Sequence, residues 1–367
     1  MDKIQIDLDP INICMVAPMG AGKTSILSTL MTYIKKNLKE AQGFSIRASA
    51  QDEKILSKFD QDLATYLGAG SFNIETGNVL EPNRNVSRKF EFEISLNSKA
   101  DTKVSQKIVI MDYPGGWIQE SNAHDDFLEH LKISRILWIP IDSPVMMQTD
   151  YNDAQEKGWM EERLCKESIK ELVKIWADFR EEDFKNTNAL SCANFVMTKC
   201  ETYFSHSLNK TRSFDVKKRF DDNYKSIVQQ IHAESPATEI FYFPVDTIGS
   251  VKIINSDWNK GILDTKYAIT NKERSIRGAS LLLKSIIDYS AAQIQSELDA
   301  IGESADKVLN TDSWIYKIWN MISGKSKLAR YQKEEIKKIV PCMTELGEKM
   351  VKLKEFDLEY NQYFQNL

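Results

Sequence analysis

The sequence has few of the residues that mark metal centres, disulfide frameworks and membrane spans. Its 367 residues include four histidines and five cysteines, and these are dispersed without metal-ligand spacing. An odd, scattered set of cysteines is typical of reduced thiols. No apolar run approaches the ~20 residues that a membrane span needs. Residues 1–9 alternate polar and apolar side chains instead of resembling a signal peptide. We therefore expect a cytoplasmic protein.

An excess of positive charge is also missing. The chain has 48 Lys and Arg against 53 Asp and Glu, which gives a net charge of −5 and argues against nucleic acid as the main partner. A hydrophobic content of 42% with 28% charged residues is that of an ordinary globular protein. The length accommodates one large domain with an appendage, or two domains.

What is present, and prominent, is a glycine-bearing loop between a predicted strand and a predicted helix. The apolar run 11–16 predicts a buried strand, and the run 25–38 is helix-forming. The order strand, small-residue loop, Gly-Lys-Thr, helix is that of a phosphate-binding loop, whose backbone N–H groups and helix N-terminus face a polyphosphate. We predict that a nucleoside triphosphate binds Ala17, Pro18, Met19, Gly20, Ala21, Gly22, Lys23, Thr24 and Ser25.

Two residues of this loop have specific predicted roles. Lys23 reaches the β- and γ-phosphates, and the Thr24 hydroxyl ligates Mg²⁺. The loop departs from the usual pattern at its first position, where Ala17 replaces glycine. Alanine adds only a methyl group and keeps an ordinary backbone conformation, so we expect the loop to keep its shape.

The order of elements predicts an α/β fold. Strands are expected at 11–16, 90–96, 107–111, 134–141, 191–197 and 240–243, and helices near 25–39, 52–66, 125–132, 155–180 and 213–232. The short linker between 96 and 107 predicts an antiparallel hairpin. The rest predicts a six-stranded, mostly parallel sheet covered by helices on both faces, with its ligand at the carboxyl ends of the strands. We expect this domain to span 1–260 and a helical region to span 270–367.

Two further motifs follow predicted strands. Asp112-Tyr113-Pro114-Gly115 follows the strand 107–111, where the aspartate can hold Mg²⁺ and Gly115 lets a backbone N–H approach the γ-phosphate. A plain Asp-Pro-Gly turn is the alternative. Thr198-Lys199-Cys200-Glu201 follows the strand 191–197. There a carboxylate can accept two hydrogen bonds from guanine, which adenine cannot donate; an exposed polar loop is the alternative.

Together these motifs resemble the Ras-fold P-loop GTPases of the translation-factor-related (TRAFAC) class, and in particular large bacterial GTPase-like proteins with an Asp-Tyr/Phe-Pro-Gly-Gly-Trp second switch, here 112–117. The resemblance covers roughly residues 10–255. It implies GTP or GDP with Mg²⁺ as ligands. Thr198, Lys199 and Glu201 then contact guanine, and the loop at Val245 and Asp246 touches the base. It also implies a first-switch Mg²⁺ ligand between 65 and 87, for which Thr76 is preferred over Thr65 and Ser87.

One departure from the family bears on hydrolysis. Many Ras-type GTPases place a water-positioning glutamine directly after the glycine of the second switch, whereas this chain has Gly116 there. The catalytic groups would then be Lys23, Thr24 and Gly115, with Gln119 as a substitute for the missing glutamine. We expect slow turnover, or hydrolysis that depends on a partner or a second protomer.

The sequence thus favours a GTP-binding regulatory switch with an effector or activating protein as partner, and a homodimer as one form. A nucleotide-dependent scaffold that barely hydrolyses and an ATP-using phosphotransferase are the alternatives; no arginine cluster marks the lid that a phosphotransferase needs. An aromatic patch at 314–322 is followed by basic residues to 338. We expect this patch to dock on the GTPase domain in preference to a membrane surface.

Overall fold

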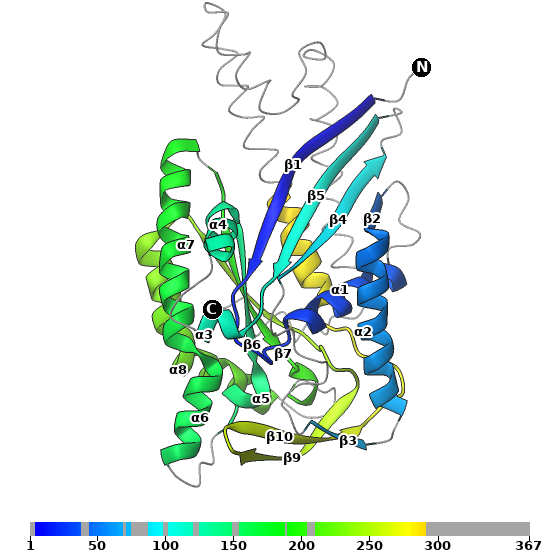
Figure 1. Ribbon diagram of the computed structural model, residues 1–367, viewed down its shortest axis with the longest axis vertical. Helices are drawn as coiled ribbons and strands as arrows, with labels where there is room; N and C mark the ends of the chain where they lie inside the picture. Colours follow the sequence, from blue (N-terminus) through cyan, green and yellow to red (C-terminus); the bar gives the residue numbers. More distant parts are fainter. Residues whose placement is uncertain are drawn as a thin grey trace, which may run out of the picture.

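A seven-stranded, mostly parallel sheet runs through the centre of the protein (Figure 1). The computed structural model describes residues 4–37, 44–68, 71–74, 87–97, 102–119, 125–148, 154–187, 189–203 and 210–290. The strands of the sheet, in spatial order, are β2 (Phe44–Ala48), β4 (Arg88–Asn97), β5 (Thr102–Asp112), β1 (Ile4–Met15), β6 (Ile136–Asp142), β7 (Cys192–Thr198) and β8 (Glu239–Pro244).

The pairing within the sheet confirms the predicted hairpin and the parallel remainder. β1 is parallel to both β5 and β6, and β6, β7 and β8 continue in parallel order. β4 is antiparallel to β5 and to β2. The sheet has seven strands where six were predicted, because the short strand β2 adds to the edge at β4. All residues of β6 and β7 are buried, as expected for central strands with both faces covered.

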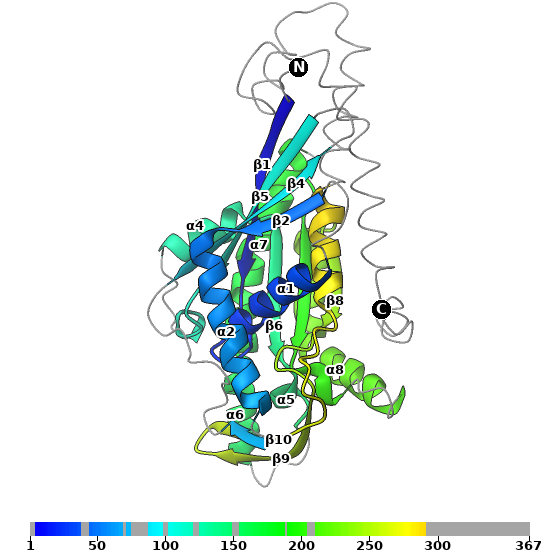
Figure 2. The same ribbon diagram turned by 90° about the vertical axis from the view of Figure 1, so that its right-hand side faces the viewer.

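Helices cover both faces of the sheet, as the alternating pattern predicts. They are α1 (Lys23–Asn37), α2 (Ala50–Gly68), α3 (Gly116–Gln119), α4 (Asp125–Ile133), α5 (Ser143–Met146), α6 (Ala154–Leu164), α7 (Lys166–Thr187), the 3₁₀ turn η1 (Cys200–Thr202) and α8 (Lys210–Glu234), followed by the helical run 279–290. Leu30 of α1 and Leu282 of the last run belong to one core cluster, and Trp176 of α7 and Phe220 of α8 belong to the other. Figure 2 shows α1 and α2 in front of the sheet, on the face that carries the cluster of Leu30 and Leu282.

The single helix predicted over 155–180 is two helices. Cys165 separates α6 from α7 and has φ 51°, in the left-handed region that a side chain disfavours. Helical hydrogen bonds continue across it, since its N–H donates to the Glu161 carbonyl and its own carbonyl accepts from the Ile169 N–H. Because the helical hydrogen bonds continue, the apolar residues keep their helical spacing on both sides of Cys165. The sequence pattern therefore could not reveal the break.

A second, smaller sheet was not predicted. It has the order β3 (Ser71–Ile74), β10 (Ile262–Ile269), β9 (Val251–Asn259), all antiparallel, and lies below α5 and beside the lower end of α6 in Figure 1. Lys260 and Gly261 form the turn between β9 and β10 with φ of 48° and 83°, as two-residue hairpin turns require. The Ile253 N–H donates to the Thr202 hydroxyl over 3.0 Å, which attaches this sheet to the loop after β7.

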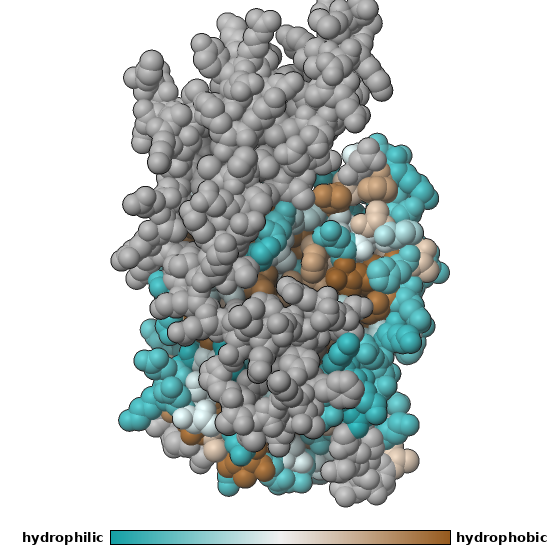
Figure 3. Space-filling view, turned by 180° about the vertical axis from the view of Figure 1, so that it is seen from behind, coloured by the Kyte–Doolittle hydropathy of each residue, from teal (hydrophilic) through white to brown (hydrophobic). Residues whose placement is uncertain are grey.

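The described surface is mostly hydrophilic on the face seen in Figure 3, with small apolar groups. Among the described helices, none is long and apolar enough to cross a bilayer. The helical run 279–290 packs into the core through Ala279, Leu282, Leu283, Ile286 and Ile287. Residues 270–278, at the start of the predicted helical region 270–367, form no helix, and residues 291–367, including the aromatic and basic patch at 314–338, lie outside the described residues, so the division into two parts stays a prediction.

Candidate functional site

The predicted phosphate loop lies between the end of β1 and the start of α1. Gly20 and Gly22 have φ of 85° and 86°, a conformation that glycine adopts without steric cost. Ala17 is buried and has no such requirement, which explains why alanine is accepted at the first position. The first turn of α1 closes directly behind the loop, since the Ile26 N–H donates to the Gly22 carbonyl over 2.9 Å.

Lys23 lies across this loop. Its Nζ donates to the carbonyl oxygens of Ala17 (2.6 Å) and Pro18 (3.1 Å), and the residue is only 8% exposed. Burial lowers the pKa of Lys23 to about 8, while the nearby Asp112 carboxylate acts in the opposite direction. A buried ammonium favours an incoming anion, because the anion adds countercharge where water is excluded.

The second motif meets the first at the start of α1. Thr24 Oγ1 donates to Asp112 Oδ2 over 2.8 Å, which joins the carboxyl end of β5 to the phosphate loop. Asp112 is 1% exposed, and burial raises the pKa of its carboxyl although Lys23 opposes the shift. A hydroxyl and a carboxylate at hydrogen-bond distance are oxygen donors of the kind that Mg²⁺ takes, so these residues fit the predicted metal. No larger cluster of acidic, His or Cys ligands occurs among the residues that the structure describes.

The predicted first-switch ligand of Mg²⁺ stays a prediction. Thr76 lies outside the described residues. Thr65 is exposed in α2, and its hydroxyl donates to the Gln61 carbonyl within the helix.

Gly115 packs directly on the phosphate loop. A Cβ added to Gly115 would lie 2.1 Å from the backbone N of Met19 and 2.5 Å from the carbonyl carbon of Pro18, so only glycine fits this approach. Gly116, in contrast, faces open space, because an added Cβ would meet nothing within 4 Å. The preceding Tyr113 holds this turn against α4 through a hydrogen bond from its hydroxyl to the Asp126 carbonyl. The side chain of Gln119 lies outside the described part of the chain.

The third motif also reaches the loop. The Thr198 hydroxyl lies 3.0 Å from the carbonyl oxygens of Ala21 and Ile141. Lys199 Nζ donates to the Gly20 carbonyl over 3.0 Å and pairs with Asp142 Oδ2 at 2.6 Å, with both side chains buried. The motif is therefore not an exposed polar loop. Asp142, at the end of β6, could be read from the sequence as a strand-capping turn or as a contact on the ligand side, and the structure pairs it with Lys199.

Glu201 is turned toward the loop that follows β8. It is 3% exposed, and its Oε1 accepts the backbone N–H groups of Ile248 (2.5 Å) and Gly249 (3.0 Å). Its Oε2 is buried without a hydrogen-bond partner among the described residues. Burial, followed by the nearby Asp246 carboxylate, raises the pKa of Glu201 to about 7. One acceptor oxygen is therefore left unsatisfied beside the loop 245–249.

Val245 and Asp246 begin that loop. Val245 continues the pairing of β8 with β7, because its N–H donates to the Met197 carbonyl over 2.7 Å. The Asp246 carboxylate is fully buried and accepts from Arg277 Nε at 2.5 Å and from the Ser275 hydroxyl. The residues 274–277 carry no motif, so sequence reasoning had no signal with which to find them.

Comparisons with known proteins do not assign a family or a function to the chain. No family model and no curated protein matches the chain. Among solved structures, it is similar to the Ski7 GTPase-like domain of S. cerevisiae bound to GTP (TM-score 0.32, 11% identity) and bound to GDP and inorganic phosphate (TM-score 0.30, 13% identity); each match covers 67% of this chain and 44% of that chain. It is also similar to the signal recognition particle receptor SRb-GTP/SRX complex from Chaetomium thermophilum (TM-score 0.33, 11% identity, 65% of this chain and 93% of that chain). Likeness at these scores adds no weight to either fold or function.

Proposed function

We propose that the protein is a GTP-binding regulatory switch that hydrolyses GTP slowly or with the help of a partner. The observation that carries the proposal is the meeting of three motifs, far apart in sequence, at one edge of the sheet. Thr24 contacts Asp112, and Thr198 and Lys199 contact the carbonyls of Ala21 and Gly20. The carboxyl ends of β1, β5 and β7 are where an open parallel sheet binds its ligands.

Each part of the site has a role in this proposal. The loop N–H groups and Lys23 bind and neutralise the phosphates. Thr24 and Asp112 hold Mg²⁺, with Thr76 as the proposed third protein ligand; the metal, when bound, neutralises charge on the β- and γ-phosphates. Gly115 brings a backbone N–H to the γ-phosphate, so the turn 113–116 changes position with the nucleotide state.

The base preference rests on Glu201. Its unsatisfied Oε2 is an acceptor for a guanine N–H, while adenine presents an acceptor at the corresponding ring nitrogen. The Lys199 stem packs against the base. An ATP-using protein is the alternative for this site.

The slow rate rests on Gly116, which has no side chain to orient water. Gln119 or a group supplied by an activating protein, an effector or a second protomer takes that role. A scaffold that binds GTP with negligible hydrolysis is the second candidate, favoured by the same glycine. In either case the region 270–367, which the sequence predicts to be helical, passes the nucleotide state to the partner.

The test is the nucleotide retained by the purified protein, followed by affinities for GTP and ATP in Mg²⁺. We expect GTP or GDP to be retained and GTP to be preferred. Glu201→Ala abolishes the preference, and Glu201→Gln, which keeps an acceptor for Ile248 and Gly249, also lowers it. Glu129→Ala, which changes an exposed residue of α4, serves as the control. Retention of ATP, or an unchanged preference in both Glu201 variants, contradicts the guanine assignment.

A further inference from the structure

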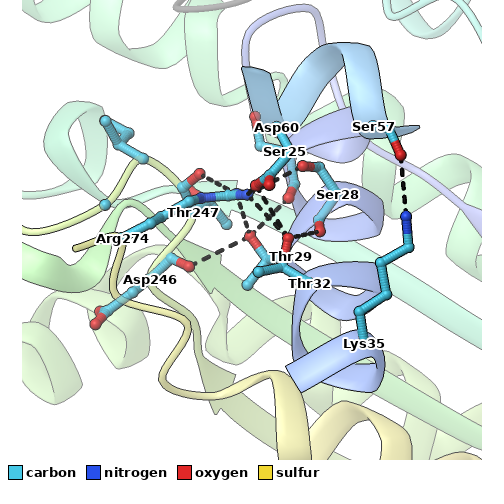
Figure 4. A network of polar contacts seen from close by, with 12 residues as sticks. Ser25, Ser28, Thr29, Thr32, Lys35, Ser57, Asp60, Asp246, Thr247 and Arg274 are labelled. Atoms are coloured by element: carbon cyan, nitrogen blue, oxygen red, sulfur yellow. Dashed lines mark hydrogen bonds and ion pairs between the residues drawn. The ribbon is translucent and has the colours of Figure 1, made fainter. Parts of the chain in front are cut away.

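A short segment between β10 and the helical run 279–290 is attached to the loop 245–249 by side chains and backbone. We call residues 274–277 the strap. The Asp246 N–H donates to the Arg277 carbonyl over 3.0 Å, and the Asp246 carboxylate accepts from Arg277 and Ser275. Three of the four strap residues thus contact this loop or the helices beside it, as Figure 4 shows for Arg274.

Arg274 joins three elements through one guanidinium group (Figure 4). Its Nη2 donates to the Thr247 carbonyl (3.1 Å) and to the Thr29 hydroxyl of α1 (2.7 Å). Its Nη1 donates to Asp60 Oδ1 of α2 (2.5 Å) and to the Ser28 hydroxyl (3.1 Å). The side chain is 6% exposed, so these bonds are formed away from water, where they are strongest.

The face of α1 that meets Arg274 is made of hydroxyl groups. Ser28, Thr29 and Thr32 are all buried there. Thr29 Oγ1 donates to the Ser25 carbonyl (2.8 Å) and Thr32 Oγ1 to the Ser28 carbonyl (2.9 Å). The 2.8 Å bond along the helix uses the Thr29 hydroxyl hydrogen and leaves its lone pairs for the guanidinium, while Thr32 Oγ1 also lies 3.0 Å from Asp60 Oδ1. A planar fork of donors matches this arrangement, and the single ammonium of lysine does not.

The opposite side of the loop is held by the third motif. The Lys199 N–H donates to the Thr247 hydroxyl over 3.0 Å, and Glu201 Oε1 accepts the N–H groups of Ile248 and Gly249. Thr247 therefore receives a hydrogen bond from Arg274 at its carbonyl and one from Lys199 at its side chain. The position of the loop relative to Glu201 depends on both sets of contacts.

We infer that the strap positions the loop 245–249 for base recognition, with Arg274 as the positioning residue that ties this loop to α1 and α2. The inference rests on the proposed function, because it assigns the loop to the base-binding half of a nucleotide site. It predicts that loss of the fork at Arg274 weakens recognition of the nucleoside while the phosphate loop keeps its own contacts.

The experiment compares a complete nucleotide with its phosphate part alone. Binding of GTPγS and of inorganic tripolyphosphate, both with Mg²⁺, is measured by calorimetry on the full chain. For Arg274→Lys, we expect the Kd for GTPγS to rise about tenfold and the Kd for tripolyphosphate to stay within about twofold. Arg180→Lys is the matched control. Arg180 is also a buried arginine that binds a backbone carbonyl and an aspartate, but its partners are Lys132 and Asp183. The Arg180→Lys variant should leave the ratio of the Kd for GTPγS to the Kd for tripolyphosphate unchanged.

A second variant covers the case in which Arg274→Lys does not fold. Asp60 is 43% exposed, so Asp60→Asn removes the charge that pairs with Arg274 without opening the core. It should raise the Kd for GTPγS by a smaller factor, about threefold, and leave tripolyphosphate unaffected. If wild-type protein binds GTPγS and both variants keep its ratio of the Kd for GTPγS to the Kd for tripolyphosphate, the role of the strap is overturned and the proposed function is not. Wild-type protein that binds tripolyphosphate but gains nothing from the guanosine overturns the proposed function.

Discussion

At the scale of single residues, the two adjacent glycines that follow Pro114, Gly115 and Gly116, have different surroundings. Gly115 lies against the backbone of Met19 and Pro18, where any Cβ would overlap the phosphate loop. Gly116 lies in open space, and its φ is not among the positive values that require glycine. Sterics therefore explain the first glycine but not the second. A side chain at position 116 has space, so the fold does not require glycine there.

Gly116→Gln tests this directly. The variant supplies an amide that can orient the attacking water, as glutamine does at this place in many Ras-type GTPases. We expect the single-turnover rate of GTP hydrolysis to rise on the order of tenfold or more, with an unchanged melting temperature. Gly116→Ala controls for the added Cβ and should leave the rate as it is. Equal rates in the two variants would mean that water positioning does not limit hydrolysis.

Glu201 makes stability depend on pH in the ligand-free protein. Its pKa rises from 4.5 when unfolded to about 7 when folded, because of burial and the Asp246 carboxylate. The folded state therefore binds the proton more tightly, and the free energy of unfolding falls as the pH rises from about 4.5 through about 7. We expect wild-type protein to lose on the order of 2 kcal/mol relative to Glu201→Gln over this range. Urea titrations at pH 5 and pH 8 measure it; parallel pH dependence in the two proteins would contradict the assignment.

At the scale of elements, the sequence predicted best what is determined locally. The phosphate loop follows from one strand, two glycines and one helix that are contiguous, and the hairpin of β4 and β5 follows from alternation across a short linker. The strands β9 and β10 were missed because their alternation is interrupted, since the register shifts where Tyr267 pairs with Ile253 and Lys266 pairs with Asn255. Arg274 was missed for a different reason. A single arginine has no periodicity, and its partners Asp60 and Thr247 are far away in the sequence.

The break between α6 and α7 gives a prediction at this scale. Cys165 keeps a left-handed φ of 51°, which costs a residue with a Cβ about 1 kcal/mol. Cys165→Gly and Cys165→Ala both remove the thiol, but only glycine removes the steric cost. We expect the glycine variant to be more stable than the alanine variant by about 1 kcal/mol in urea denaturation. A more stable alanine variant would show that the two helices join without strain.

At the scale of the whole molecule, the three motifs follow three different strands of the central sheet, β1, β5 and β7, so a ligand that contacts all of them stabilises the sheet as a unit. Mg²⁺·GTP at about 100 times its Kd should raise the free energy of unfolding by about 2.7 kcal/mol. Thermal scans with GTP, ATP and tripolyphosphate check this. GTP should give the largest shift, and removal of Mg²⁺ with EDTA should reduce it. Equal shifts with GTP and ATP would contradict a base-specific site.

The small sheet of β3, β10 and β9 has a consequence for how the chain is made. β3 ends at Ile74, but its partner β10 begins at Ile262, roughly 190 residues later. At about 5–20 residues per second of synthesis, β3 leaves the ribosome on the order of 10–40 seconds before its partner exists. Throughout that interval its hydrogen-bonding edge has no strand to pair with. The sheet that is attached to the loop after β7 is thus completed only once β10 has been synthesised.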